Sequence, residues 1–312
     1  MDLDEYAAAV AGLDHLVNPI GIGWAGPTIV AGGSPEQQAR WLPGILDGSE
    51  FWCQLFSEPE AGSDLASLRT RAVRDGDRYR VTGQKIWSTW ADRARWGILL
   101  ARTDPSASKH KGISYFVLDM DAPGIEVRPI IEMTGGNHFN EVFLDDVAVP
   151  VDHRIGDEHD GWRLARVTLA NERESLSKGG VLWGMGPTTG DLFALDAFGA
   201  GPHGPFADRV HGPGRRQRAA AIRTSQLVLE HLDDPSVRKT LADEHGQHVM
   251  ALAKDLRGAA GMLGEQSPDA EERDVWHWGY LFSRALTIGG GTSEVQRTII
   301  GERLLGLPRE PT

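Results

Sequence analysis

The stretch TRAVRDGDRYRVTGQKIWSTWADRARWGILLA, residues 70–101, decides the fold. Asp75-Gly76 separates the β-rich run 70–74 from the run 78–82, and this dipeptide between two such runs indicates a β-hairpin. Further short β-rich runs follow, with turn-forming residues between them, at 86–90, 96–101, 113–118, 125–131 and 141–149. Strands at this spacing, without intervening helices, predict a compact antiparallel barrel or sandwich.

The segments on both sides of this region have helical patterns. A first helix is expected around 6–10 and a second after Ser34, where Pro35 takes the first helical position. Further helices are expected at 161–178, 216–232, 237–263, 270–286 and 293–305. The Gly- and Pro-rich stretch 184–214 is too broken for a helix, so a surface excursion is expected there.

This order predicts an α+β fold in three parts, rather than a sheet whose strands alternate with helices. The first part is a partial N-terminal helical domain, residues 1–48. The second is a middle antiparallel β-barrel domain, residues 49–152, and the third is a C-terminal four-helix-bundle-like domain, residues 153–312.

The composition is that of an acidic globular protein. The 312 residues carry a formal charge of -12, which argues against a nucleic acid as the main partner because phosphate binding needs a basic surface. The single cysteine, Cys53, excludes an internal disulfide, and the apolar run 51–56 around it predicts a buried thiol. The acidic start and the lack of a long apolar run predict no secretory leader and no membrane span, so a cytoplasmic protein is expected. No metal site is predicted.

Residues 21–26, Gly-Ile-Gly-Trp-Ala-Gly, match the G-x-G-x-x-G pattern of dinucleotide-binding loops. That fingerprint requires a strand directly before it. Here Asn18-Pro19 precedes it, and proline does not occur within a central strand. The favoured interpretation is that these small residues allow helices to pack closely.

Four motifs carry a resemblance to a known family. They are FSEPEAGSD at 56–64, GQKIWST at 83–89, GNHFNEVFLDDV at 136–147, and GGGTSEVQR at 289–297, which continues into ERLLG at 302–306. In this order and spacing they resemble the signatures of the acyl-CoA dehydrogenase superfamily, in the style of actinobacterial fatty-acid and steroid catabolism. The resemblance implies FAD-dependent α,β-dehydrogenation of an acyl-CoA thioester. It also implies an electron-transferring flavoprotein as partner and a homo- or hetero-oligomer, either dimer or tetramer.

The resemblance assigns residues to a flavin site. It implies that Trp87 packs against the flavin, that Thr89 hydrogen-bonds near its reactive nitrogen, and that Phe56 and Ser57 meet its pyrimidine edge. Independently, Trp87 and Thr89 lie two residues apart, so on a strand they face the same side. At the last helix, Ser293 and Gln296 have the spacing of a capping box, and the resemblance places Thr292 and Glu294 against FAD. The alternative is that these residues are core, loop and cap residues.

The reaction needs a base for the Cα proton. In many members of the family a glutamate stands where this chain has Gly290, so the usual base is absent there. The resemblance of LANER, 169–173, to another branch points to Glu172. Independently, Ala165, Leu169, Glu172 and Leu176 share one helix face, so Glu172 interrupts an apolar stripe. The alternative is a structural pair between Glu172 and an arginine.

The remaining assignments follow from the resemblance alone. Ser63 is implied to contact the CoA chain, and Arg173 to bind substrate. The backbone N–H of Gly290 is implied to hold the thioester carbonyl. The resemblance implies further helices before the segment with which this sequence begins, and the stretch 184–214 shows no match to the family's arginine-phenylalanine-glycine segment. Two rival functions therefore stay open: a non-catalytic subunit of a heteromeric dehydrogenase, and a flavin oxidase or monooxygenase on the same fold.

Overall fold

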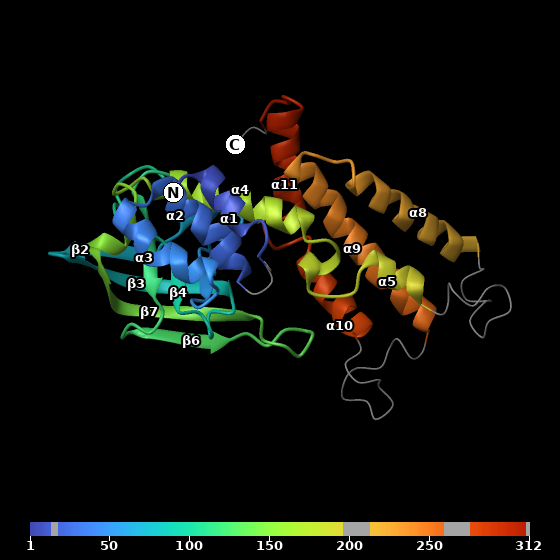
Figure 1. Ribbon diagram of the computed structural model, residues 1–312, viewed down its shortest axis with the longest axis horizontal. Coiled ribbons are helices and arrows are strands. Elements are labelled where there is room, and N and C mark those ends of the chain that lie inside the picture. Colours follow the sequence, from blue (N-terminus) through green and yellow to red (C-terminus); the bar gives the residue numbers. More distant parts are fainter. Residues whose placement is uncertain (14–17, 196–212, 259–274, 310–312) are drawn as a thin grey trace. The chain divides into compact units, whose positions relative to one another are not determined.

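The computed structural model describes residues 1–13, 18–195, 213–258 and 275–309 (Figure 1). These residues form two compact units, Met1–Glu172 and Arg173–Thr312. Most of the contacts of each unit are internal to it.

The first unit opens with the expected helices. They are α1 (Leu3–Val10), the π-helical turn η1 (Gly21–Ala25), α2 (Gly26–Gly32) and α3 (Pro35–Leu46). Helix α3 begins as predicted: Ser34 caps it through the Gln37 N–H, with Pro35 in the first turn. Helix α1 has a similar capping box between Asp2 and Glu5.

The glycines at 21–26 lie in helices that pack closely, which confirms the interpretation made from the sequence. The Tyr6 hydroxyl of α1 donates to the Ile22 carbonyl at 2.8 Å. A Cβ atom on Gly26 would lie 1.9 Å from that hydroxyl oxygen, so no larger residue fits at this crossing.

The sheet is more mixed than predicted. Its strands are β1 (Trp52–Leu55), β2 (Arg71–Asp75), β3 (Arg78–Thr89), β4 (Trp96–Arg102), β5 (Ile113–Asp119), β6 (Ile125–Pro129), β7 (Phe139–Pro150) and β8 (Arg154–Ile155). The order is β6-β7-β3-β2-β4-β5-β8, and β1 pairs with β4. Both β1 and β2 run parallel to β4, and the barrel is not closed, so the wholly antiparallel barrel was wrong.

The predicted hairpin is confirmed, and Asp75 pairs with Arg78 across it. The expected runs 78–82 and 86–90 form one continuous strand, β3, rather than two. Strands β1 and β8 were not predicted, because a short apolar run and a two-residue strand carry no alternating pattern.

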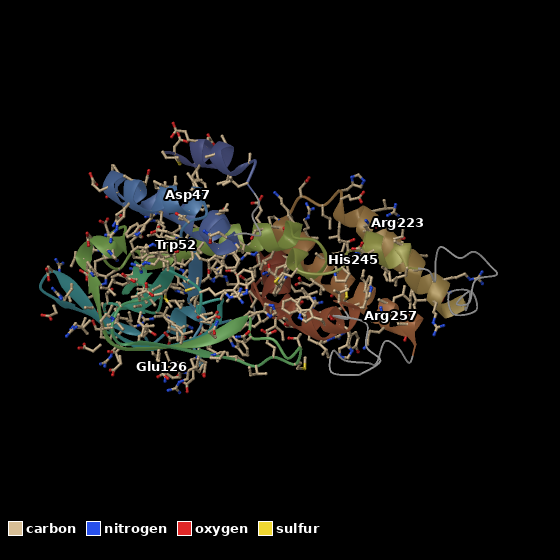
Figure 2. The ribbon with its side chains drawn as sticks, turned by 60° about the horizontal axis from the view of Figure 1, so that its bottom comes forward. Asp47, Trp52, Glu126, Arg223, His245 and Arg257 are labelled. Atoms are coloured by element: carbon tan, nitrogen blue, oxygen red, sulfur yellow. The ribbon has the colours of Figure 1, made fainter. Side chains whose placement is uncertain are left out.

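Strand β4 is buried on both faces and separates two apolar cores. Ile98 and Leu100 pack with the N-terminal helices and with Trp52, which Figure 2 labels in this unit. Leu99 and Ala101 face the second core, which contains the buried Cys53 predicted from the sequence. A strand that is buried on both faces carries apolar residues on both, so β4 does not alternate between polar and apolar residues.

The second unit is helical, as predicted for the C-terminal part. Helix α4 (Gly161–Lys178), at its predicted bounds, runs into it from the first unit. The others are η4 (Val181–Gly184), α5 (Thr189–Ala194), α8 (Pro213–Leu229), α9 (Pro235–Arg257), α10 (Val275–Phe282), η7 (Ser283–Ala285), α11 (Ser293–Ile299) and η8 (Ile300–Leu304). Helix α9 packs against α8, α10 and α11 (Figure 1). The four-helix-bundle arrangement and the domain limits at 48 and 152 stay predictions.

The Gly- and Pro-rich stretch contains the short helix α5, capped by Thr188, so the expectation that it is too broken for a helix was wrong there; its part from 196 to 212 lies outside the described residues. None of the helices described here has the length and apolar character that crossing a bilayer requires. Among the same residues, no group of three or more His, Cys, Asp or Glu side chains could hold a metal ion.

Candidate functional site

The loop that begins the first motif is fixed to β3 by a buried ion pair. The Lys85 ammonium donates to Glu58 Oε1 at 2.8 Å and to the Phe56 carbonyl at 3.1 Å. Glu58 also accepts from the backbone N–H groups of Arg69 and Thr70, at 2.6 and 2.9 Å. Every donor converges on one carboxylate, so the loop has little freedom to move relative to the strand.

Both members of this pair stay ionised at neutral pH. Burial lowers the pKa of Lys85 to about 8, although the charge and the hydrogen bond of Glu58 act to raise it. Burial alone would raise the pKa of Glu58, but the Lys85 charge and the hydrogen bonds from Lys85 and the loop backbone hold it below its ordinary value. Sequence reasoning missed this pair, although Lys85 stands within a β-rich motif where a charge signals a buried partner.

Trp87 lies on the surface, and its backbone has a left-handed conformation that residues other than glycine rarely adopt. Its φ is 61°, and its side chain is 57% exposed. Lys85 pairs with Val142 and Ser88 with Asn140, so two residues of β3 oppose the single Glu141 in a β-bulge. An exposed indole on strained backbone at a bulge is typical of a functional position.

Phe139 supports Trp87 from the neighbouring strand. The two rings meet edge to face, with centroids 6.0 Å apart and planes at 83°. Thr89 pairs with Phe139 and is half-buried, whereas Ser88 between Trp87 and Thr89 is fully buried. Exposure alternates along these three residues, but the bulge interrupts the regular strand on which the predicted shared side of Trp87 and Thr89 was based, so that placement stays a prediction.

Ser57 lies beside this part of β3, whereas Ser63 lies on the turn that follows. The Ser57 carbonyl accepts from the Ile86 N–H at 3.0 Å. The Phe56 ring is buried edge to face against Tyr115, with centroids 5.9 Å apart, so only the Phe56 backbone is left for a ligand. Ser63 is exposed on the following turn, next to Asp64, which accepts from Lys109.

Glu172 lies on the buried face of α4. Its residue exposure is 8%, Ala165 on the same face is fully buried, and Leu169 is partly buried. The Gln54 amide of β1 donates to Glu172 Oε2 at 3.1 Å. Sequence reasoning missed Gln54, although an amide within the apolar run 51–56 is a signal that it has a polar partner.

The C-terminal motif forms a tight glycine loop before α11. Gly290 and Gly291 have φ values of 64° and 85°, which favour glycine. Gln296 reaches back to the Gly290 carbonyl at 3.3 Å. The helix cap is Thr292, whose hydroxyl accepts from the Val295 N–H at 3.2 Å, so the predicted Ser293–Gln296 capping box was wrong.

Glu294 is exposed in the first turn of α11. Hydrogen bonds from the helix backbone and from Thr292 lower its pKa, as expected for a carboxylate at a helix N-terminus. Behind the loop, Lys239 and Asp243 of α9 form a buried pair at 2.7 Å, and Lys239 also donates to the Leu286 carbonyl at 3.3 Å. Burial raises the pKa of Asp243 to about 6.

The predicted residues therefore fall into two groups, one in each unit. The first unit contains Phe56, Ser57, Ser63, Trp87, Thr89 and Glu172, and the second contains Arg173, Gly290, Thr292 and Glu294. Within the first, the structure brings Phe56 and Ser57 to β3; within the second, it brings Gly290, Thr292 and Glu294 to one loop and helix start.

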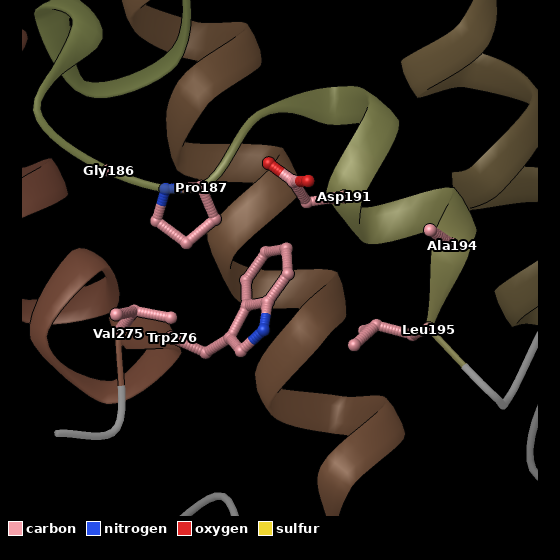
Figure 3. A pocket seen from close by; sticks show the side chains of 7 residues that line it. All are labelled: Gly186, Pro187, Asp191, Ala194, Leu195, Val275 and Trp276. Carbon is pink, nitrogen blue, oxygen red and sulfur yellow. The ribbon is translucent and has the colours of Figure 1, made fainter. Parts of the chain in front are cut away.

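Neither of two pockets found among the described residues contains a predicted residue. The first, of about 450 Å³, is lined by Gly186, Pro187, Asp191, Ala194, Leu195, Val275 and Trp276. Figure 3 shows the Trp276 indole projecting into it, with Asp191 on α5. The second, of about 500 Å³, has four basic residues among its lining: Arg69, Arg71, Arg102 and Lys109. Arg69 and Lys109 already pair with Glu60 and Asp64.

Comparison with known proteins connects these features to one family. Residues 53–147 match the acyl-CoA dehydrogenase middle domain, and residues 216–305 match the acyl-CoA dehydrogenase C-terminal domain. Acyl-CoA dehydrogenase FadE34 of Mycobacterium tuberculosis is 43% identical over 92% of this chain, which spans only 39% of that protein. Acyl-CoA dehydrogenase IpdE1 of the same organism is 41% identical over 98% of this chain and 79% of its own length.

Solved structures agree with the sequence matches. The ChsE4-ChsE5 complex of M. tuberculosis contains a chain that is 32% identical, with a TM-score of 0.81, over 97% of this chain and 80% of that one. The Tcur3481-Tcur3483 steroid acyl-CoA dehydrogenase (ACAD) is 31% identical, with a TM-score of 0.82, over 93% and 77%. On these matches, the chain belongs to the acyl-CoA dehydrogenase family.

Proposed function

We propose that this chain, with FAD bound, dehydrogenates an acyl-CoA thioester between Cα and Cβ. The observation that carries the proposal is Glu172, a glutamate 8% exposed on the buried face of α4 and hydrogen-bonded by Gln54. A carboxylate in such a setting suits the removal of a weakly acidic Cα proton.

The residues of β3 fit a flavin. A flat ring needs an aromatic wall and polar groups along one edge. Trp87 offers an exposed indole supported by Phe139, and Thr89 stands two residues further along the strand. The Lys85–Glu58 pair holds the loop of Phe56 and Ser57 against the same strand. When bound, FAD supplies the acceptor for the hydride that leaves Cβ.

The chain's own residues handle the proton and the carbonyl. A Glu172 oxygen takes the Cα proton, so that the loss of a proton and a hydride leaves one new C=C bond. The N–H of Gly290 holds the thioester oxygen, where charge builds up as the proton leaves. Thr292 and Glu294 contact FAD at the start of α11, and Ser63 and Arg173 contact the substrate.

Several relatives bear names that suggest a bulky acyl group. The Tcur3481-Tcur3483 structure is described as a steroid ACAD, and a relative in Geobacter metallireducens is named cyclohexane-1-carbonyl-CoA dehydrogenase. We therefore propose an alicyclic or steroid side-chain acyl-CoA as the substrate class. We also propose an electron-transferring flavoprotein as the electron acceptor.

A second candidate function is that of one subunit in a heteromeric dehydrogenase. The observation that favours it is that one of the similar structures is the ChsE4-ChsE5 complex. In this case the chain binds FAD and acyl-CoA only together with a related subunit.

The test is an absorption spectrum of the purified protein, followed by anaerobic titration with butanoyl-, octanoyl- and cyclohexane-1-carbonyl-CoA. We expect a flavin spectrum that bleaches with at least one thioester. Glu172→Gln is expected to retain the spectrum and lose bleaching. Glu174→Gln is the matched control, because Glu174 is exposed on the same helix and pairs with Lys178 at 2.6 Å. A colourless protein that takes up no flavin, alone or with a related subunit, would refute the proposal.

A further inference from the structure

Gln54 is the only amide in a strand of otherwise apolar residues. Trp52, Cys53 and Leu55 of β1 are fully buried, whereas Gln54 is half-buried and pairs in register with Ile98 of β4. Its Nε2 donates to Glu172 Oε2 at 3.1 Å, across 118 positions of the chain. Its Oε1 is buried and has no hydrogen-bond partner among the residues that the structure describes.

A buried amide oxygen without a hydrogen-bond partner is unfavourable, and an apolar residue would avoid that penalty. Within the described part of the chain, the one polar contact of this side chain is with Glu172. The amide must present its N–H side to an ionised carboxylate, because the opposite orientation would place two oxygens against each other. This orientation suits the ionised form of Glu172, in which both carboxylate oxygens can accept.

Helix α4 is fixed one turn before Glu172. The Thr168 hydroxyl lies 2.8 Å from that of Thr28 on α2 and 3.0 Å from that of Tyr115 on β5. All three side chains are buried. Thr168 and Glu172 are four residues apart and share a helix face, so these contacts set the rotation of α4 and bring the carboxylate over β1.

We propose that Gln54 is a positioning residue for the general base: it holds one oxygen of Glu172, sets the plane of the carboxylate and keeps it ionised. The catalytic consequence rests on the proposed function, but the coupling between the two residues does not. A donor to a charged carboxylate favours the ionised form, so its removal makes protonation easier.

The experiment measures the titration of the Glu172 carboxyl by NMR, with ¹³C-labelled glutamate and with Glu172→Gln to assign the signal. We expect Gln54→Met, which keeps the length and loses the donor, to move the titration midpoint upward by about one pH unit. Gln54→Glu is a second variant, expected to move it upward further because a second carboxylate adds like charge. The control is Gln38→Met in the same unit, since Gln38 donates to the Val30 carbonyl at 3.3 Å and accepts from the N-terminal ammonium at 3.2 Å.

The second readout is the pH dependence of kcat/KM with whichever of the three thioesters bleaches the flavin. Its acidic limb is expected to move upward with the NMR midpoint, whereas a merely structural residue would lower kcat at every pH without moving the limb. If the titration midpoint of Glu172 is unchanged in both Gln54 variants, the inference is overturned. If the wild-type protein nevertheless oxidises a thioester, the proposed function still stands. A shifted midpoint in a protein that oxidises no thioester would uphold the coupling and count against the function.

Discussion

Lys85 and Glu58 form a salt bridge of 2.8 Å in which neither side chain is more than 8% exposed. The pair joins the first motif to the second, so it connects two pieces of sequence that both contribute to the proposed flavin site.

The buried pair makes a testable contribution to stability. Lys85→Met leaves the Glu58 carboxylate buried without its cation, which is expected to lower the free energy of unfolding by about 3–5 kcal/mol in urea titrations. The control is Arg128→Met, which breaks the exposed pair with Glu126 and is expected to cost less than about 1 kcal/mol. Equal losses in the two variants would show that Lys85 does not stabilise the loop.

Trp87 is predicted to act on flavin binding rather than on folding. Because its side chain is 57% exposed, Trp87→Ala is expected to change the free energy of unfolding of the flavin-free protein by less than about 1 kcal/mol. Loss of the stacking surface is expected to weaken FAD binding by roughly tenfold in fluorescence titrations. Val73→Ala removes a similarly exposed side chain from β2 and should leave FAD affinity as it is.

Gly290 and Gly306 form a matched pair, with φ values of 64° and 65°. Alanine at either position is expected to destabilise the protein by about 1–2 kcal/mol, because the left-handed region is unfavourable for a Cβ atom. Only Gly290→Ala is expected to reduce kcat, since it displaces the N–H that we assign to the thioester oxygen. A similar fall in kcat for Gly306→Ala would remove Gly290 from the site.

His245 is predicted to make the helical unit sensitive to acid. Its ring lies between the hydroxyls of Thr189 and Ser225, at 2.7 and 2.6 Å, and Figure 2 labels it in this unit. Burial lowers its pKa from 6.5 to about 4, so between these values the unfolded chain binds more protons than the folded one. The contribution of the neutral ring is complete above pH 6.5 and is lost as the pH falls to about 4.

This loss amounts to roughly 3 kcal/mol over that interval. Unfolding titrations at pH 7.0, 5.5 and 4.5 should show a fall that is reduced in His245→Gln. His231→Gln, at an exposed position on the same unit, should follow the wild type. The idea is contradicted if the pH dependence of His245→Gln is unchanged.

The helices were the part of the fold that could be predicted best. Helix α4 has an apolar stripe with a period that a strand cannot share, and it begins and ends where predicted. The hairpin at Asp75-Gly76 was equally clear, because the Asp-Gly dipeptide by itself favours a tight turn between two strands. The capping residue at α11 was misjudged by one position, since Thr292 and Ser293 both carry hydroxyls and stand side by side.

The pairing of strands depends on segments that are distant in the sequence, and it was predicted less well. Nothing within the run 51–56 indicates that it pairs in parallel with Trp96–Arg102. The bulge and the positive φ of Trp87 depend on the neighbouring strand β7, and the bond from Gln54 to Glu172 joins segments that only the folded chain brings together. Residue types could therefore indicate candidates for the site, but not the contacts that orient them.

Strand β4 has no side that water can occupy, and this constrains how the molecule is made. When Ile98, Leu99, Leu100 and Ala101 leave the ribosome, one face is bare until the earlier helices fold onto it, and the other until the strands of the second core, β7 among them, pack against it. A shortened chain without α1–α3 would leave Ile98 and Leu100 facing solvent and would tend to aggregate. The N-terminal helices thus act as a cover for the sheet, which makes them necessary for solubility even where they contribute nothing to chemistry.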